Sequence, residues 1–167
     1  MDLEDTVRDL VPQLLRFCLG QTGDPALAEE AAQEALTALV QRWRRHGPPE
    51  CPAAFAFAVA RRRAFRLRLK RRLLEPLQTL FDRRSPEPSP EEQAVSRADG
   101  RRLLAALRRL APGDRAALLL VGVEGMELSR GAEILGVSLS AIKMRVHRAR
   151  KRLTLLLKEL EDTNGDA

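Results

Sequence analysis

The chain has 167 residues, of which 44% are hydrophobic and 31% are charged, and its formal net charge is +6. No apolar run reaches the roughly 18 residues of a membrane span, and the acidic, amphipathic N-terminus is unlike a signal or transit peptide. These features exclude membrane insertion and a disordered chain, and they predict a cytoplasmic, basic, helical protein of one ordinary domain or two small ones.

The first two helices are predicted from apolar spacing and from their end signals. Apolar residues at three- and four-residue spacing predict a helix over 5–19, with Gly20 as its C-cap. The second helix begins at Asp24, an N-cap residue, because Pro25 follows at the first helical position. It ends before residues 46–49, because the sequence HGPP is typical of a loop.

A third helix begins at Pro52 and runs through Phe65 into the basic sequence RLRLKRR. With the first two helices it predicts a small bundle, the N-terminal domain 1–75. Residues 76–99 are predicted to be a flexible linker, because 85–90 contains three prolines and shows no periodicity. Ser89 offers an alternative in this linker, as the cap of a helix that runs to residue 110.

Further helices are predicted over 113–121, 128–135 and 138–160, followed by an acidic tail, 161–167. The strand signal is poor throughout. The sequence therefore predicts an all-α fold of two small helical domains, 1–75 and 100–160, joined by a flexible Pro-rich linker. The second of these contains a helix-turn-helix.

The charge is distributed in blocks of opposite sign. Residues 1–40 carry two basic and eight acidic side chains, whereas 41–72 carry eleven basic side chains and one acidic. Residues 73–99 and 161–167 are acidic on balance, and 100–160 carry thirteen basic and five acidic side chains. Two basic blocks indicate a polyanion bound at two places, although Arg-rich helices are also common as solvated faces.

The sequence from 127 to 153 has the pattern of a helix-turn-helix. Gly136 suits the left-handed turn after the short helix 128–135, and Ser138 can cap the next helix. Ala132 is small enough for the two helices to approach each other. The predicted shared core is Ile134, Leu135, Val137, Ile142, Val146 and Ala149, with Leu153 continuing the stripe.

The outer face of the second of these helices is basic, because it carries Ser140, Lys143, Met144, Arg145, His147, Arg148, Lys151 and Arg152. A helix with an apolar back and a basic front fits the major groove of B-DNA, where its side chains can reach base edges and phosphates. DNA binding is favoured over a plain helical hairpin.

These residues carry a family resemblance. The second half, with LLAAL at 103–107, LAPGDR at 110–115 and RVHRARKRL at 145–153, resembles the C-terminal DNA-binding domain of bacterial extracytoplasmic-function (ECF) sigma factors. The first half is similar to their N-terminal domain: GDPALAEEAAQE at 23–34 matches the family's AED…Q helix, and 55–72 matches the helix that ends in an ARN…RR pattern.

The resemblance implies a protein that binds core RNA polymerase and directs it to promoter DNA, with an anti-sigma factor as a further partner. The C-terminal domain would read the minus-thirty-five element as duplex. The residues implied in this contact are Ser138, Ser140, Lys143, Met144, Arg145, His147 and Arg148. Arg145 is expected to meet a phosphate or to support the fold.

The N-terminal domain would bind the polymerase through Glu30, Gln33 and Glu34. It would also capture unpaired bases of the minus-ten element through Phe55, Arg61, Arg62, Arg63 and Arg66. Phe55 and Phe57 are alternatively core residues. The chain departs from the family pattern at Arg62, Arg66 and Gly131, and a glycine inside a helix costs about 1 kcal/mol against alanine.

The sequence gives no sign of an enzyme. Cys18 and Cys51 lie in separate elements, as do His46 and His147, and no metal-ligand spacing or phosphate loop is visible. We expect no catalytic residues, no metal and no cofactor. Two other classes stay open: a helix-turn-helix regulator that acts without polymerase, and a degenerate sigma-like protein that binds an anti-sigma partner.

Overall fold

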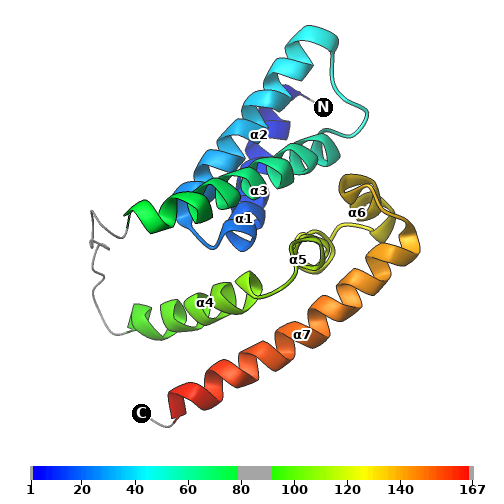
Figure 1. The fold of residues 1–167 in the computed structure, drawn as a ribbon. Helices are drawn as coiled ribbons and strands as arrows, with labels where there is room; N and C mark the ends of the chain where they lie inside the picture. The colour runs from blue at the N-terminus through cyan, green and yellow to red at the C-terminus, as the bar shows by residue number, and fades with distance from the viewer. Residues whose placement is uncertain (1, 79–91, 166–167) are drawn as a thin grey trace.

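A computed structural model describes residues 2–78 and 92–165, and every regular element in these two ranges is helical (Figure 1). The N-terminal half consists of α1 (Leu3–Thr22), α2 (Pro25–His46) and α3 (Pro52–Gln78). Each of these helices packs against the other two, which confirms the predicted bundle. The all-α prediction is confirmed as well.

The end of α1 differs from the prediction. The helix continues past Gly20 to Thr22, and its C-cap is Gly23, which has a left-handed φ of 67°. Gly20 lies inside the helix and is buried. The predicted cap was therefore wrong by one turn, because both glycines fit the local pattern and only one of them adopts the cap conformation.

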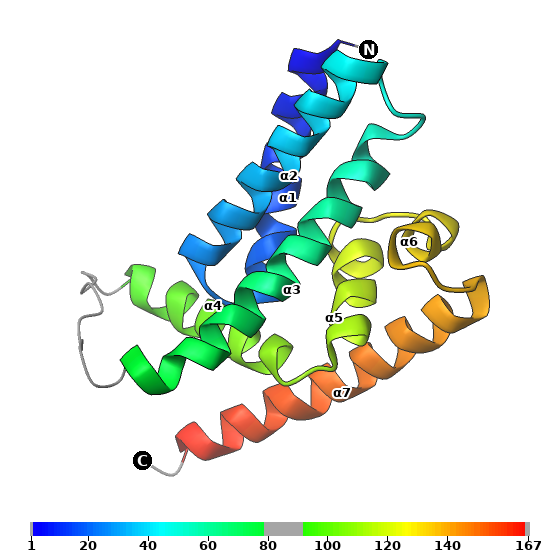
Figure 2. The same ribbon diagram turned by 45° about the horizontal axis from the view of Figure 1, so that its top comes forward.

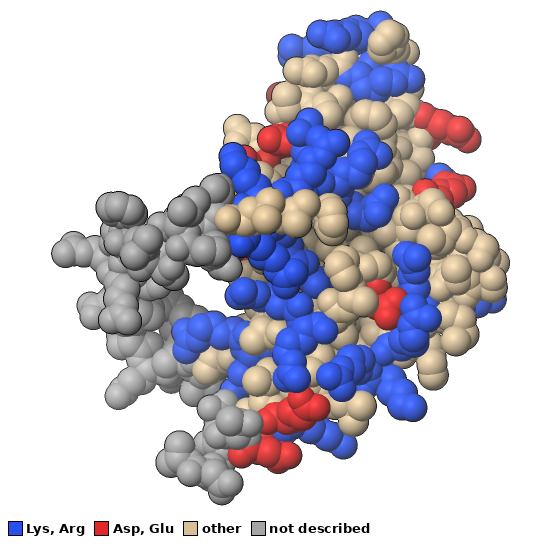
Figure 3. Space-filling view, viewed as in Figure 1, with Lys and Arg blue, Asp and Glu red and all other residues tan. Residues whose placement is uncertain are grey.

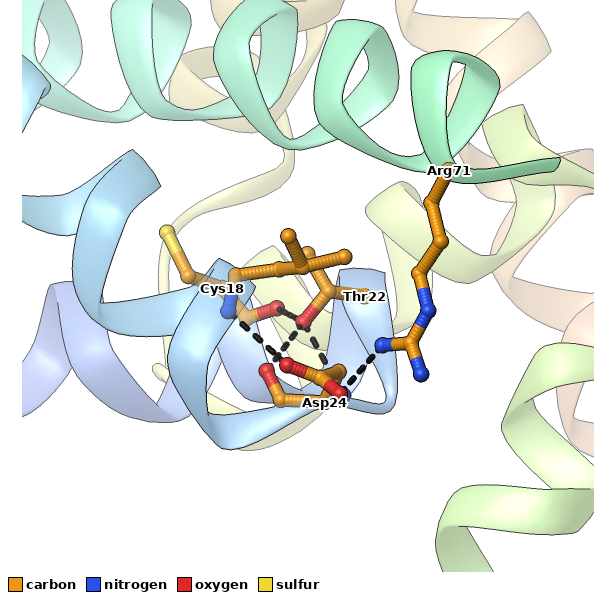
Figure 4. Close-up of polar contacts among 5 residues, drawn as sticks. Cys18, Thr22, Asp24 and Arg71 are labelled. Carbon is orange, nitrogen blue, oxygen red and sulfur yellow. Dashed lines mark hydrogen bonds and ion pairs between the residues drawn. The ribbon is translucent and has the colours of Figure 1, made fainter. Parts of the chain in front are cut away.

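The start of α2 agrees with the prediction. The Asp24 carboxylate accepts a hydrogen bond from the Leu27 N–H at 2.9 Å, and Pro25 occupies the first helical position. Figure 4 shows Arg71 reaching this carboxylate from α3, while the Thr22 hydroxyl bonds to the backbone N–H and carbonyl of Asp24. The turn between α1 and α2 is thus fixed by side chains from three elements.

The C-terminal half consists of α4 (Glu92–Arg108), α5 (Pro112–Leu118), a π-helical turn η1 (Leu119–Val123), α6 (Leu128–Leu135) and α7 (Leu139–Gly165). The helix predicted over 113–121 is therefore an α-helix followed by a π-helix. Helix α3 extends into the start of the predicted linker 76–99, and α4 begins before the end of that linker. Helix α7 extends into the predicted acidic tail 161–167. The Pro-rich stretch 85–90 and the alternative cap Ser89 lie outside the described residues.

The two halves pack against each other (Figure 2). Helix α1 contacts α4, α5 and η1, and α3 contacts α6, so buried residues of both halves form one hydrophobic cluster. The contact at Gly20 is close: a Cβ there would lie 2.6 Å from Cδ2 of Leu119. Gly20 is thus needed for packing between the halves. The division into domains 1–75 and 100–160 stays a prediction.

A buried arginine lies in this contact between the halves. Arg115 of α5 is 1% exposed, and its guanidinium donates at 2.8 Å to the carbonyl oxygens of Gln21 and Leu110. A weaker bond, at 3.4 Å, reaches the carbonyl oxygen of Arg108. The carbonyls of Gln21 and Arg108 belong to the last turns of α1 and α4, where carbonyl groups lack partners within the helix, and Leu110 lies just after the end of α4. Arg115 therefore joins the two halves through their helix C-termini.

The longest helices, α3 and α7, have 27 residues each. Both carry too many charged side chains for a bilayer, and none of the described helices meets the length and apolarity of a membrane span.

Candidate nucleic-acid interface

The turn between α6 and α7 has the geometry predicted for a helix-turn-helix. Gly136 has φ 63° and ends α6, and the Val137 N–H donates to the Ala132 carbonyl at 3.0 Å. The Ser138 hydroxyl then accepts from the Ala141 N–H at 3.1 Å, which caps the start of α7. Both local predictions, the left-handed glycine and the serine cap, are confirmed.

The closest approach of α6 and α7 is at Gly131. A Cβ on this residue would lie 2.7 Å from Cδ1 of Ile142, which is fully buried. Ala132, which was predicted to permit the approach, is buried beside it. The departure from the family pattern at Gly131 therefore has a packing reason that its low helix propensity did not suggest.

Helix α7 separates its apolar and polar sides as predicted. Ile142, Val146 and Ala149 are buried with Ile134 and Leu135 of α6. On the outer side Arg145 is half-buried, and the other residues expected to face DNA are exposed: Ser138, Ser140, Lys143, Met144, His147 and Arg148. The structure thus brings these side chains together on one accessible face.

Two arginines of this face are held by α5. The Arg148 guanidinium donates to both carboxylate oxygens of Asp114, at 2.8 and 3.1 Å, and this carboxylate raises the pKa of Arg148. The Arg145 guanidinium lies over Gly113, where a Cβ would come within 2.9 Å of it. A bidentate pair of this kind fixes the direction of the side chain. The contacts with α5 therefore orient part of the recognition face, the exposed side of α7 whose side chains are expected to face DNA.

A second basic surface lies on α3. Figure 3 shows Lys and Arg side chains gathered over α3 and α7 on this face of the molecule. On α3, Arg62 and Arg66 are exposed, whereas Arg61 and Arg63 are half-buried. The Arg63 Nε lies 2.7 Å from Oε2 of Glu34. One residue predicted to bind DNA and one predicted to bind polymerase are therefore paired with each other.

The exposed aromatic residue of α3 is Phe65, which the site prediction did not include. Its side chain is 53% exposed, whereas Phe55 is half-buried against the core. Phe57 is buried and packs edge-on against Phe17, with ring centroids 5.2 Å apart. The alternative interpretation of Phe55 and Phe57 as core residues is the one that the packing supports. The signal for Phe65 was its position off the buried stripe of α3.

Phe65 borders a cavity of about 380 Å³ between α3 and α5. The amide nitrogen of Gln21 and the Nε of Arg61 are buried without a hydrogen-bond partner in the described residues. Burial, Arg62 and Arg145 all lower the pKa of Arg61. The cavity is lined by Gln21, Arg61, Arg62, Phe65, Arg66, Pro112, Gly113 and Ala116. It thus combines an aromatic ring, guanidinium groups and an unused amide donor.

The residues predicted to contact polymerase lie on α2. Glu30 and Gln33 are exposed, and Glu34 is half-buried in its pair with Arg63. Gln33 borders a groove of about 520 Å³ between α1 and α2. Most of the groove wall is apolar, formed by Val11, Leu15, Ala32, Leu36 and Val40. The structure therefore adds an apolar surface to the acidic face that the sequence suggested.

Within the described ranges, no group of three His, Cys, Asp or Glu side chains is placed to hold a metal ion. The Cys18 thiol is buried, and burial raises its pKa to about 12, so it is protonated at neutral pH. The chemistry that the described surfaces offer is charge, hydrogen bonding and apolar contact.

Comparisons with known proteins find relatives for both halves of the chain. Family models for Sigma-70 region 2 and Sigma-70 region 4 match residues 6–73 and 100–153. The ECF RNA polymerase sigma factor EcfG of Rhodopseudomonas palustris is 31% identical over 163 residues, 94% of this chain and 88% of EcfG. The ECF RNA polymerase sigma factor SigL of Mycobacterium tuberculosis is 30% identical over 148 residues, 88% of this chain and 84% of SigL.

A solved structure has a similar fold. The sigma factor RpoE of Bartonella quintana, crystallised with the anti-sigma factor NepR, superposes with a TM-score of 0.71 at 24% identity. The superposition covers 93% of this chain and 98% of RpoE.

Replacing Arg148 by alanine tests the recognition face. We expect Arg148→Ala to weaken binding to a duplex selected by the wild-type chain by about 1–3 kcal/mol, because a guanidinium fork that reads a base is lost. Fluorescence anisotropy against the selected and a scrambled duplex measures the difference. Lys158→Ala removes an equal charge farther along α7 and serves as the control. Equal loss on both duplexes would mean that Arg148 contacts phosphate only, and unchanged binding would contradict the assignment.

Proposed function

Because the chain belongs to the ECF family of bacterial RNA polymerase sigma factors, we propose that its two halves divide the work of promoter recognition. The protein binds core RNA polymerase and directs promoter-specific transcription initiation. Residues 1–75 would bind polymerase and the minus-ten element, and residues 100–160 the minus-thirty-five element. The observation that carries the proposal is the pair of basic surfaces, on α3 and α7. This role places the protein in the bacterial cytoplasm.

For the minus-thirty-five element, the support is the helix-turn-helix. The exposed side of α7 begins directly at the Ser138 cap, so Ser140, Lys143 and Met144 lie in the first turns of the helix. The first turns of a recognition helix are the part that reaches base edges in the major groove. His147 and Arg148 follow on the same side and extend the contact along the groove.

For the minus-ten element, the support is the cavity beside Phe65. Unpaired bases bind where an aromatic ring allows stacking and cations neutralise the backbone. Phe65 supplies the exposed ring, and Arg62 and Arg66 supply exposed charges on the same helix. Arg61 adds a half-buried guanidinium at the cavity wall. We propose Phe65, rather than Phe55, as the stacking residue.

The minus-ten assignment predicts a selective defect in Phe65→Ala. Removing a stacking ring costs about 1–3 kcal/mol per base, so binding of polymerase with this variant to a single-stranded minus-ten oligonucleotide should weaken accordingly. Binding of the free protein to upstream duplex should not change. Leu73→Ala, which removes another exposed apolar side chain from α3, is the matched control. Equal behaviour of the two variants would contradict the role of Phe65.

For core polymerase, the support is the groove between α1 and α2. Its apolar wall can be buried by a partner, and Glu29, Gln33 and Arg44 border it. Glu30 is exposed on α2 but lies outside the lining of this groove. An interface with an apolar centre and a charged rim gains affinity from the first and orientation from the second. The RpoE structure with its anti-sigma factor supports the further proposal that an anti-sigma protein is a partner of this chain.

The polymerase assignment predicts that a bulky side chain at Gln33 blocks the groove. Gln33→Trp should weaken binding to core polymerase by about tenfold or more, as a clash at an interface centre does, while helicity and duplex binding stay unchanged. Asp9→Trp places the same bulk on an exposed part of α1 away from the groove and should bind normally. Size-exclusion and anisotropy assays measure the affinities. Unchanged affinity of Gln33→Trp would overturn the assignment.

A further inference from the structure

Four arginines line a small polar cavity where α3 meets α4, away from the surfaces assigned above. Arg68, Arg71 and Arg72 come from α3 and Arg108 comes from α4, and the cavity has a volume of about 90 Å³. The turn between α1 and α2 forms its remaining wall. The cavity therefore lies at a junction of the two halves.

The one carboxylate in the wall of this cavity is already engaged. Asp24 accepts from the Leu27 N–H and pairs with Arg71 (Figure 4). Partial burial acts to raise the pKa of Asp24, but the bonds from Leu27 and Arg71 outweigh it and lower the pKa. Asp24 is therefore ionised at neutral pH and balances one guanidinium. Arg68, Arg72 and Arg108 have no carboxylate partner in the described part of the chain.

The positive side chains are held close together by the fold. The stem of Arg108 lies across the turn, because a Cβ on Gly23 would come within 2.5 Å of Arg108 Cδ. The buried Arg115 lies near the cluster: burial lowers its pKa first, and Arg68, Arg72 and Arg108 lower it further. Burial, Arg72 and Arg108 lower the pKa of Arg68 in the same way. Like charges that line one small cavity repel each other, and an anion bound between them would offset this repulsion.

We propose that this cavity binds a phosphate-bearing anion, which bridges α3 and α4 through Arg68, Arg72 and Arg108. Guanidinium groups present planar pairs of N–H donors that match two oxygens of one phosphate, and several converging forks suit a multiply charged group. The cavity is small and its lining is polar and basic, as suits a phosphate group. The phosphate belongs either to a free small anion or to a nucleic-acid backbone, and the experiment below separates these sources.

A bridging anion would also strengthen the packing of the two halves. Its ligands come from α3 on one side and from α4 on the other, so it binds the packed arrangement better than a separated one. A ligand that binds only the folded, packed state raises the stability of that state by mass action. Binding can therefore be measured in two ways, by calorimetry and by the rise in melting temperature.

The test uses the full chain and inorganic pyrophosphate at constant ionic strength. We expect saturable binding in calorimetry and a higher melting temperature for the wild type, and affinity reduced about tenfold or more in Arg72→Gln and in Arg108→Gln, since each loses one charged fork. Arg150→Gln removes one exposed charge from α7 and should bind as the wild type does. Absence of saturable binding, or equal affinity of all four proteins, would overturn the proposal.

Two additions keep the test decisive. If a glutamine variant loses helicity by circular dichroism, Arg72→Lys and Arg108→Lys keep the charge but lose the fork, so they should bind pyrophosphate more weakly than the wild type. Affinity equal to the wild type would again overturn the site.

Labelled single-stranded and duplex DNA identify the source of the phosphate. Weaker DNA binding by the cavity variants, with displacement by pyrophosphate, assigns a backbone phosphate, and unchanged DNA binding assigns a free anion.

Discussion

The buried guanidinium of Arg115 is the interaction on which the arrangement of the two halves depends. Among the described residues it has no carboxylate partner, and it donates instead to carbonyl oxygens at the end of α1 and at and just after the end of α4. A buried charge is costly unless its donors are matched, and helix C-termini supply acceptors that are unpaired within the helix and carry partial negative charge. Both terminal nitrogens of Arg115 are matched in this way, whereas its Nε is buried without a partner among the described residues. The close contact of Gly20 with Leu119 completes this junction. Arg115 thus fixes α5 against α1.

The position of α5 in turn shapes both candidate DNA surfaces. Its first turn carries Gly113 and Asp114, which hold Arg145 and Arg148 of the recognition helix. Gly113, with Pro112 and Ala116, also forms a wall of the cavity that Phe65 borders. Bases or phosphates that bind these surfaces therefore compete with contacts inside the protein. If the proposed surfaces bind promoter DNA, this binding is coupled to the packing of the halves through α5.

Local features of the sequence predicted the local structure well. Asp24, Gly136 and Ser138 act at helix ends through bonds to neighbouring residues, so their roles are visible in the sequence. The packing roles of Gly20 and Gly131 were not predicted, because each glycine makes room for a side chain from another element, Leu119 or Ile142. The all-α fold followed from periodicity, whereas the packing of one half on the other depends on long-range contacts.

The candidate site was predictable to the same extent. The outer face of α7 follows from helical spacing around Ile142 and Val146, and the structure has that face exposed. The choice between Phe55 and Phe65 required the packing of α3, because both lie in an apolar and basic helix. The buried role of Arg115 could not be inferred from the LAPGDR motif that contains it, since its partners are backbone carbonyls up to 94 positions away.

The distance between the halves in solution tests the central role of Arg115 most directly. Spin labels at Lys70 of α3 and Lys158 of α7, both exposed, report this distance by pulsed electron paramagnetic resonance. The wild type should give one narrow distribution, and Arg115→Met, with its helicity unchanged, should give a broader distribution that extends to longer distances. An Arg115→Met distribution identical to that of the wild type would contradict the account.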